Sequence, residues 1–223
     1  MKKIDIEKLE AVIFDYDGTL LDTEKLFYNC MRDVSYREYG IKLDKLDYIR
    51  NVSGTSTENS QNYFVKTYKV TDYPRFEKIV ISELTARFDE AEILPGIIDT
   101  LKLLKKHNIK TAIASNGDRK HVLDGLVYKK LDKYFDAVVT REDSKNLKPA
   151  PDVYYKACEV LGVNIKNTIA VEDSYPGAMA ASSSGSNLIL QTNDITKYMD
   201  FSNVNYKVRD CDLFKVIKSV LEK

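Results

Sequence analysis

The chain has 223 residues, enough for one well-buried α/β core and a second, smaller lobe, since domains typically hold about 100–200 residues. Its 34 lysines and arginines balance 34 aspartates and glutamates, so no large net charge favours binding to nucleic acid or to a membrane surface. No apolar run approaches the roughly 18 residues of a membrane-spanning helix, and we expect a cytoplasmic monomer with a small-molecule partner.

Cysteine and histidine are scarce and give no sign of a metal or nucleophile site of their own. Cys30, Cys158 and Cys211 are far apart, which favours reduced thiols over a disulfide framework or a zinc site. His107 and His121 each lie in a segment of helical periodicity, so a Ser-His-Asp apparatus is poorly supported.

The first predicted strand, Ala11–Asp15, is followed by a long helical interval. From Glu24 to about Glu92 the pattern is helical, and no convincing buried strand interrupts it. Its helices are expected near Glu24–Tyr39, Leu43–Asn51, Ser56–Tyr68 and Pro74–Asp89. We interpret residues 23–92 as an inserted helical domain, with Leu94-Pro95-Gly96 as a hinge that returns the chain to the sheet. One continuous domain with long excursions is the alternative.

After the hinge, short apolar runs alternate with helical patterns. Further strands are predicted at Lys110–Ser115, Asp136–Thr140, Thr168–Glu172 and Asn187–Gln191. Helices are predicted at Ile97–His107, Arg119–Lys130, Pro151–Leu161, Tyr175–Ser184 and Asp212–Leu221. The alternation predicts an α/β fold with a doubly wound parallel sheet, built from residues 1–22 and 93–223.

Two carboxylates, Asp15 and Asp17, stand at the exit of the first buried strand. Ligands bind outside the carboxyl ends of the strands in an open α/β sheet, so these acids lie where chemistry is usually done. Such a close pair favours a bound divalent cation or a raised pKa. An acidic turn held by Asx hydrogen bonds is the bland alternative, and an EF-hand loop fits worse because Leu20 takes the place of its glycine.

Other strand exits carry matching side chains. Ser115 offers a hydroxyl, and Asn116-Gly117 adds backbone N–H groups in a turn that can cup an anion. Lys148 lies in a stiff, proline-flanked segment, and Glu172-Asp173 ends another buried run. Each feature alone is more often a turn, a surface lysine or a helix N-terminus rich in acids. Together they predict a single cleft.

In order and spacing, Asp15, Asp17, Ser115, Lys148, Glu172 and Asp173 resemble the motifs of the haloacid dehalogenase superfamily. The helical insertion is similar to the small cap of its β-phosphoglucomutase-like phosphatases. This resemblance implies a Rossmann-like core and a magnesium-dependent phosphatase that acts on a small phosphate monoester. The run Ser115-Asn116-Gly117 resembles that of phosphatases for sugar-acid phosphates.

The resemblance also implies a role for each matching residue. Asp15 would be the nucleophile and Asp17 the general acid and base. Ser115, Asn116 and Lys148 would bind the phosphate. Mg²⁺ would be held by the Asp15 carboxylate, the Asp17 backbone carbonyl and Asp173, with Glu172 orienting a bound water.

Three alternatives differ in class. A dehalogenase needs only the first aspartate of the motif, so the presence of Asp17 argues against it. A phosphosugar mutase would share the core residues, but Thr57 and Phe27 stand where the mutase pattern has a cap arginine and a hinge histidine. A catalytically silent binding protein would keep the fold, although no core motif is missing from this sequence.

Overall fold

The computed structural model describes residue 4 and residues 6–222 and divides into two compact units. Unit 1 comprises residues up to Leu21, Ile93–Asn193 and Asp200 onward, and unit 2 comprises Asp22–Glu92 and Asp194–Met199. The predicted insertion at 23–92 did not include Asp194–Met199. That segment joins unit 2 because the buried side chain of Ile195 packs into the unit 2 core. Residues 1–3 and 5 of the predicted core lie outside the described part.

Unit 1 contains a six-stranded sheet in the order β3-β2-β1-β4-β5-β6. All strand pairings in this sheet are parallel. The strands are β1 (Ala11–Phe14), β2 (Lys110–Ala114), β3 (Ala137–Val139), β4 (Thr168–Glu172), β5 (Asn187–Leu190) and β6 (Val208–Arg209). The first five match the predicted strands to within about a residue at each end, and the doubly wound α/β prediction is confirmed. The sequence did not predict β6, which is too short to show a pattern.

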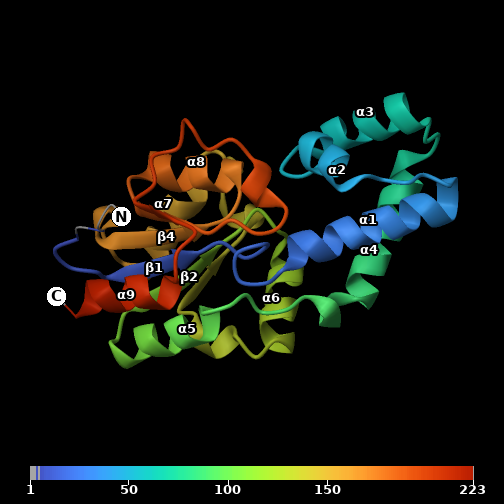
Figure 1. The fold of residues 1–223 in the computed structure, drawn as a ribbon. Helices are drawn as coiled ribbons and strands as arrows, with labels where there is room; N and C mark the ends of the chain where they lie inside the picture. The colour runs from blue at the N-terminus through green and yellow to red at the C-terminus, as the bar shows by residue number, and fades with distance from the viewer. Residues whose placement is uncertain (1–3, 5, 223) are drawn as a thin grey trace. The chain divides into compact units, whose positions relative to one another are not determined.

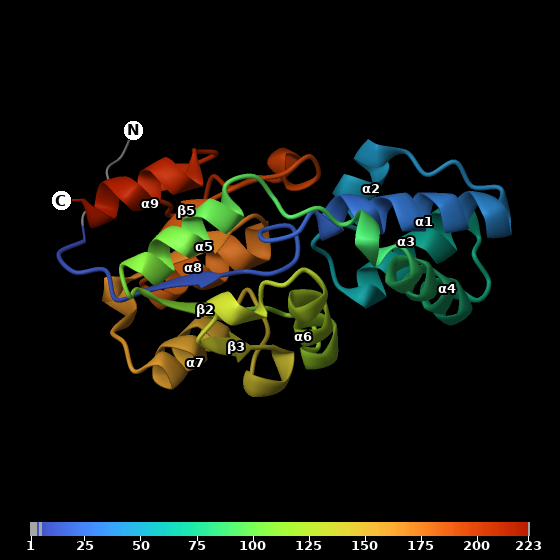
Figure 2. The same cartoon turned by 90° about the horizontal axis from the view of Figure 1, so that it is seen from below.

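Helices cover both faces of this sheet. Unit 1 contains α5 (Ile97–Lys106), α6 (Arg119–Tyr128), α7 (Asp152–Leu161), α8 (Tyr175–Ser184) and α9 (Leu213–Leu221). Figure 1 shows α7 and α8 above the sheet, and α5 and α9 below it. Seen from below in Figure 2, α5 and α9 lie side by side. The strands therefore have apolar neighbours on both sides, which explains their unbroken hydrophobic runs.

Unit 2 is a helical bundle with a core of its own. Its helices are α1 (Thr23–Tyr39), α2 (Lys45–Asn51), α3 (Thr57–Tyr68) and α4 (Tyr73–Ala86). Side-chain oxygens of Asp44, Ser56 and Asp72 accept backbone N–H groups at the starts of α2, α3 and α4. Aromatic rings fill the centre, where the rings of Phe64 and Phe76 lie 5.0 Å apart.

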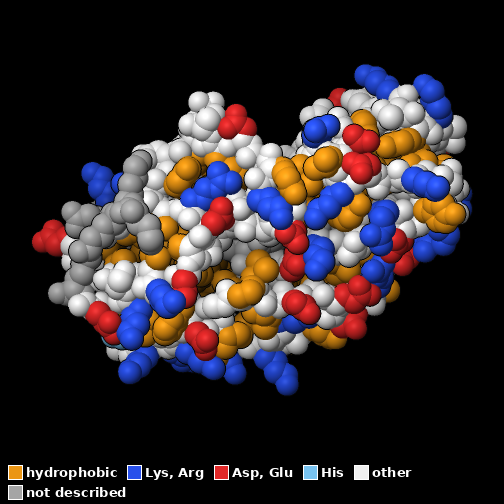
Figure 3. All heavy atoms as spheres, viewed as in Figure 1, with side chains coloured by type: hydrophobic (Ala, Val, Ile, Leu, Met, Phe, Trp, Pro, Cys, Tyr) orange, Lys and Arg blue, Asp and Glu red, His pale blue; other side chains and the backbone are white. Residues whose placement is uncertain are grey.

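The surface has a mixed charge pattern. On the face drawn in Figure 3, basic and acidic side chains are interspersed instead of gathered by sign. This agrees with equal numbers of the two kinds in the sequence. Among the described residues, no helix is both long and apolar enough to cross a membrane.

Candidate active site

The order in which strands are added to the sheet changes direction between β1 and β4, and the predicted acids lie at this point. The first three strands extend from β1 to one edge, and β4 then starts the other half beside β1. Phe14 is paired with Ile113 of β2 and with Val171 of β4, so Asp15 and Glu172 leave the sheet at the same level. A switch point of this kind creates a crevice at the carboxyl ends of the strands.

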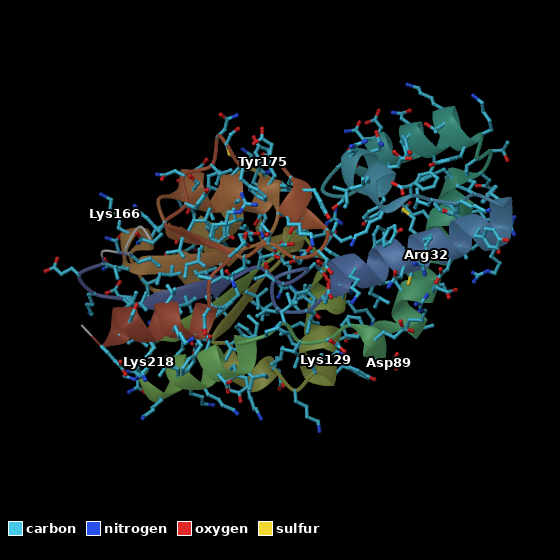
Figure 4. All side chains as sticks on the ribbon, in the orientation of Figure 1. Arg32, Asp89, Lys129, Lys166, Tyr175 and Lys218 are labelled. Atoms are coloured by element: carbon cyan, nitrogen blue, oxygen red, sulfur yellow. The ribbon has the colours of Figure 1, made fainter. Side chains whose placement is uncertain are left out.

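Lys148 connects the strand ends. Its Nζ lies 2.6 Å from Asp15 Oδ1 and 2.6 Å from Glu172 Oε1, and it donates to the Ala114 carbonyl at 2.7 Å. Only 4% of this side chain is exposed. Other lysines of unit 1, such as Lys166 and Lys218, point outward in Figure 4. A buried lysine needs paired acceptors, and Lys148 is bound on all three sides.

The buried charges shift one another's ionisation. Burial, together with the charge of Glu172, raises the pKa of Asp15 to about 7, although Lys148 offsets part of this effect. Burial alone would lower the pKa of Lys148, but the charges of Asp15 and Glu172 outweigh it and hold that pKa above its usual value. Lys148 therefore stays charged, and among the described residues it is the one buried cation against three buried acids, Asp15, Glu172 and Asp173.

This excess charge fits a cation bound by oxygen. Asp15, Glu172 and Asp173 are buried, and each offers a carboxylate oxygen within 4.8 Å of the others. Asp173 is also oriented from outside the cluster. Its oxygens accept from Thr19 Oγ1 at 3.3 Å and from Asn193 Nδ2 at 2.8 Å. Hard, all-oxygen donors suit Mg²⁺ better than Zn²⁺ or copper, so the residues present fit the predicted ion.

The turn after β2 contains Ser115 and Asn116. Ser115 is buried, and its Oγ accepts from the Gly117 N–H at 2.9 Å. The Asn116 amide does not point to open space. Its Oδ1 accepts from the Lys148 N–H at 2.9 Å, and its Nδ2 donates to the Lys148 carbonyl at 3.3 Å. Asn116 thus fixes the backbone of Lys148, and its predicted role in substrate binding stays a prediction.

Glu172 is locked in place by two neighbours. Oε1 accepts from Lys148 and also from the Tyr154 hydroxyl, at 2.6 Å, while Oε2 has no hydrogen-bond partner among the described residues. The carboxylate fills the space beside Gly177, where an added Cβ would lie 2.0 Å from Oε2. Glycine at this position therefore makes room for the acid.

Asp17, the other acid of the first motif, is half-buried and lies at the edge of this cluster. His121 Nε2 lies 3.2 Å from Asp17 Oδ1, and this hydrogen bond raises the pKa of His121 against the opposing effect of burial. The helical pattern around His121 gave no reason to expect this contact.

Of the residues that the sequence predicted for the site, the structure brings Asp15, Lys148, Glu172 and Asp173 together. The sequence analysis missed three residues around them: Tyr154, Asn193 and His121. Asn193 could have been predicted, because it follows the strand ending near Gln191, and polar residues just after buried strands were the signal used for the other site residues. Tyr154 and His121 lie on helices, and helical periodicity does not show which side chains reach a site.

Known proteins are similar to this chain over the span that contains these residues. The family model described as haloacid dehalogenase-like hydrolase matches residues 12–191, a span that contains every predicted site residue. Phosphorylated carbohydrates phosphatase of Thermotoga maritima is 34% identical over 179 residues, which cover 79% of this chain and 82% of the relative. Pyrophosphatase PpaX of Halalkalibacterium halodurans is 26% identical over 185 residues, which cover 80% and 81%.

The fold is also shared with solved structures. A Thermotoga maritima protein described as a β-phosphoglucomutase matches with a TM-score of 0.79 and 28% identity, covering 96% of this chain and 99% of that one. The match covers both units, so the helical insertion is part of the likeness.

Proposed function

We propose a substrate and a mechanism for this chain, which belongs to the haloacid dehalogenase-like hydrolase family and is a phosphoric monoester hydrolase. The substrate is a small sugar or sugar-acid phosphate. The reaction passes through a phosphorylated Asp15 and requires Mg²⁺. The observation that carries this proposal is the buried contact of Lys148 with both Asp15 and Glu172 at the switch point. In this contact the Asp15 carboxylate, which we propose as the nucleophile, lies beside a fixed cation, an arrangement suited to transferring an anionic group.

In the first step, a carboxylate oxygen of Asp15 attacks phosphorus while the bond to the ester oxygen breaks. Asp17 gives its proton to the leaving alkoxide, which departs as an alcohol. In the second step, water attacks the phosphorus of the aspartyl phosphate, and Asp17 takes the proton of that water. The bond from phosphorus to Asp15 then breaks, which releases inorganic phosphate and restores both acids.

Lys148 and the turn after β2 stabilise the charge that spreads over the phosphoryl oxygens in each step. Lys148 Nζ already lies at Asp15, and Ser115 and the N–H groups of the turn supply neutral donors. Asp15, Asp173 and the Asp17 backbone carbonyl would hold Mg²⁺, with Glu172 orienting one of its waters, and the bound ion would supply further positive charge to the phosphate.

Support for the substrate class comes from the Thermotoga maritima relative that is named for phosphorylated carbohydrates. A panel of sugar, polyol and nucleotide monophosphates, with pyrophosphate included, tests it by phosphate release. We expect the sugar and sugar-acid phosphates to have the highest kcat/KM. A preference for pyrophosphate would replace this substrate class while keeping the catalytic residues.

The intermediate can be captured chemically. Borohydride reduces an aspartyl phosphate to homoserine, so quenching during turnover should convert residue 15 to homoserine in the peptide mass spectrum. Asp15→Asn protein, treated identically, is the control. Homoserine absent from wild-type protein that is releasing phosphate would contradict the covalent route.

The metal requirement is tested separately. Exhaustive chelation should abolish phosphate release and added Mg²⁺ should restore it, whereas Ca²⁺ should support little turnover because its larger, looser shell spoils in-line geometry. Asp173→Ala should raise the Mg²⁺ concentration needed for half-maximal rate. Full activity after chelation would remove Mg²⁺ from the proposal.

A mutase of the β-phosphoglucomutase type is the competing function, because the Thermotoga maritima structure is described that way. Such an enzyme must shelter its aspartyl phosphate from water. Here Thr57 begins α3 without a charge to grip a second phosphate, and Phe27 packs against the unit 2 core. Supplying β-glucose 1-phosphate with a trace of the bisphosphate should release phosphate faster than it forms glucose 6-phosphate. The reverse order would favour the mutase.

A further inference from the structure

His121 is one of two histidines in the chain, and its imidazole lies against the Asp17 carboxylate. We propose that His121 is a positioning residue that holds one oxygen of Asp17 and leaves the other oxygen free for proton transfer. The inference rests on the proposed role of Asp17 as acid and base, and it adds a residue that acts through Asp17.

The contact joins two distant parts of unit 1. Nε2 of His121 lies 3.2 Å from Oδ1 of Asp17, which is 104 positions earlier in the chain. Whenever the Asp17 carboxylate is ionised it can only accept hydrogen bonds, and the imidazole N–H is then the donor. The contact occupies Oδ1, so Oδ2 is the oxygen left to carry the transferred proton.

The imidazole is itself held on two sides. Asp118 caps the start of α6 by accepting from the His121 N–H at 2.9 Å, which fixes the backbone at this position. The fully buried ring of Tyr16 meets the imidazole edge to face, with centroids 5.6 Å apart and an angle of 88°. Tyr16 lies between Asp15 and Asp17, so the motif that carries both acids also supports the histidine.

The two oxygens of Asp17 have different surroundings. Oδ1 faces His121, whereas Oδ2 faces the turn after β2. A Cβ added to Gly117 would lie 3.5 Å from Asp17 Oδ2 and 3.1 Å from Ser115 Oγ. Because Ser115 belongs to the proposed phosphate site, Oδ2 is the Asp17 oxygen that faces that site. Rotation of the carboxylate would lose this alignment, and the His121 contact opposes that rotation.

The contact should matter for the reaction more than for the fold. The side chains of His121 and Asp17 are 30% and 32% exposed. Ion pairs open to solvent to this extent contribute little to stability. Misplacement of a catalytic group, in contrast, can reduce a rate by as much as about 10²-fold.

Two substitutions separate the hydrogen bond from the ring packing. His121→Phe keeps a ring beside Tyr16 and removes the donor, and His121→Gln keeps a donor and removes the ring. Each variant is assayed with an alkyl phosphate, whose leaving group needs a proton, and with p-nitrophenyl phosphate, whose leaving group does not. We expect His121→Phe to lower kcat for the alkyl ester by roughly 10- to 100-fold, with a much smaller loss for the aryl ester and little change in KM. His121→Gln should recover most of that loss.

Wild-type protein and Asp17→Asn, assayed in parallel, distinguish failure of the proposed function from failure of the His121 proposal. If wild type releases no phosphate, or Asp17→Asn slows both esters equally, the proposed function fails. If those controls behave as expected, three results would overturn the His121 proposal: unchanged activity in His121→Phe, equal losses on both esters, or a further loss when His121→Phe is added to Asp17→Asn. Thermal unfolding of each variant checks that it is folded. If His121→Phe is misfolded, His121→Gln alone tests the proposal, and a loss of its alkyl-ester rate would overturn it.

Discussion

The two units bury different kinds of side chain. Among the described residues, the buried charged side chains all belong to unit 1: Asp15, Lys148, Glu172 and Asp173. Unit 2 buries aromatic and aliphatic side chains, and its charged groups, such as Arg37 and Glu83, pair at the surface. Burying charge opposes folding, whereas burying rings drives it. Substitutions in unit 1 should therefore change activity, and substitutions in the unit 2 core should change stability.

Asp15→Asn should have the largest effect, a loss of at least about 10⁴-fold in kcat, because an amide cannot form the covalent intermediate. The fold should survive, since Glu172 still pairs with Lys148. Phosphate release and thermal unfolding are measured together, with exposed Asp124→Asn as the matched control. A large fall in melting temperature would mean that the buried acid supports the fold, which would contradict the expected difference between the two units.

Phe64→Ala should be the largest stability change in unit 2. Its ring is fully buried and meets Phe76 at 5.0 Å and Tyr73 at 5.9 Å. Loss of a buried aromatic ring costs about 3–5 kcal/mol in the free energy of unfolding. Urea unfolding measures it, and Val65→Ala, at a neighbouring exposed position, should change stability far less. Equal costs at the two positions would argue against the unit 2 core as described.

Gly177→Ala tests the space that glycine leaves for Glu172. In an ordinary helix this change would favour folding by about 1 kcal/mol. Here the new methyl group would lie 2.0 Å from Glu172 Oε2, and Lys148 and Tyr154 hold the acid in place. Displacing Glu172 also disturbs Lys148, so we expect kcat/KM to fall by about 10²-fold. Ser183→Ala in the same helix controls for propensity, and unchanged activity in Gly177→Ala would show that Glu172 can move freely.

Tyr154→Phe should have the smallest of these effects. It removes one hydrogen bond to Glu172 and keeps the buried ring. Hydrogen bonds to charged groups contribute about 1.5–3 kcal/mol, and Lys148 still holds the same oxygen, so a loss of roughly 10-fold in kcat/KM is expected. Tyr155→Phe, at the neighbouring half-exposed tyrosine, is the control. A loss as large as that of Gly177→Ala would make the Tyr154 hydroxyl the main support of Glu172.

The difference between buried charge in unit 1 and buried rings in unit 2 also explains which features could be predicted from the sequence. Unit 1 was predictable because buried strands give unbroken apolar runs, and acids directly after such runs are conspicuous. In unit 2, helical periodicity predicted α1 to α4, but periodicity reports which face is buried and says nothing of which side chains meet a substrate. The buried Ile195 joined unit 2 from a segment near β5, and no local pattern could reveal that long-range packing.

The contact between His121 and Asp17 was missed for a related reason. A histidine near the start of a helix has no special spacing from an aspartate 104 positions away. Only the pairing of β1 with β2 and the capped start of α6 bring the two together. Tyr154 was likewise hidden, because its position on α7 is typical of a core aromatic residue, which it also is.

The assignment of Asp194–Met199 to unit 2 means that the backbone passes from one unit to the other four times, near residues 21, 92, 193 and 199. Unit 2 is therefore not a single continuous segment that can be removed or exchanged as one piece. A truncated protein lacking residues 22–92 would expose Ile195, which is now fully buried. A chimera that receives the helical unit of a relative would also need that relative's equivalent of residues 194–199, because a graft of residues 22–92 alone would leave Ile195 against a core with which it did not evolve.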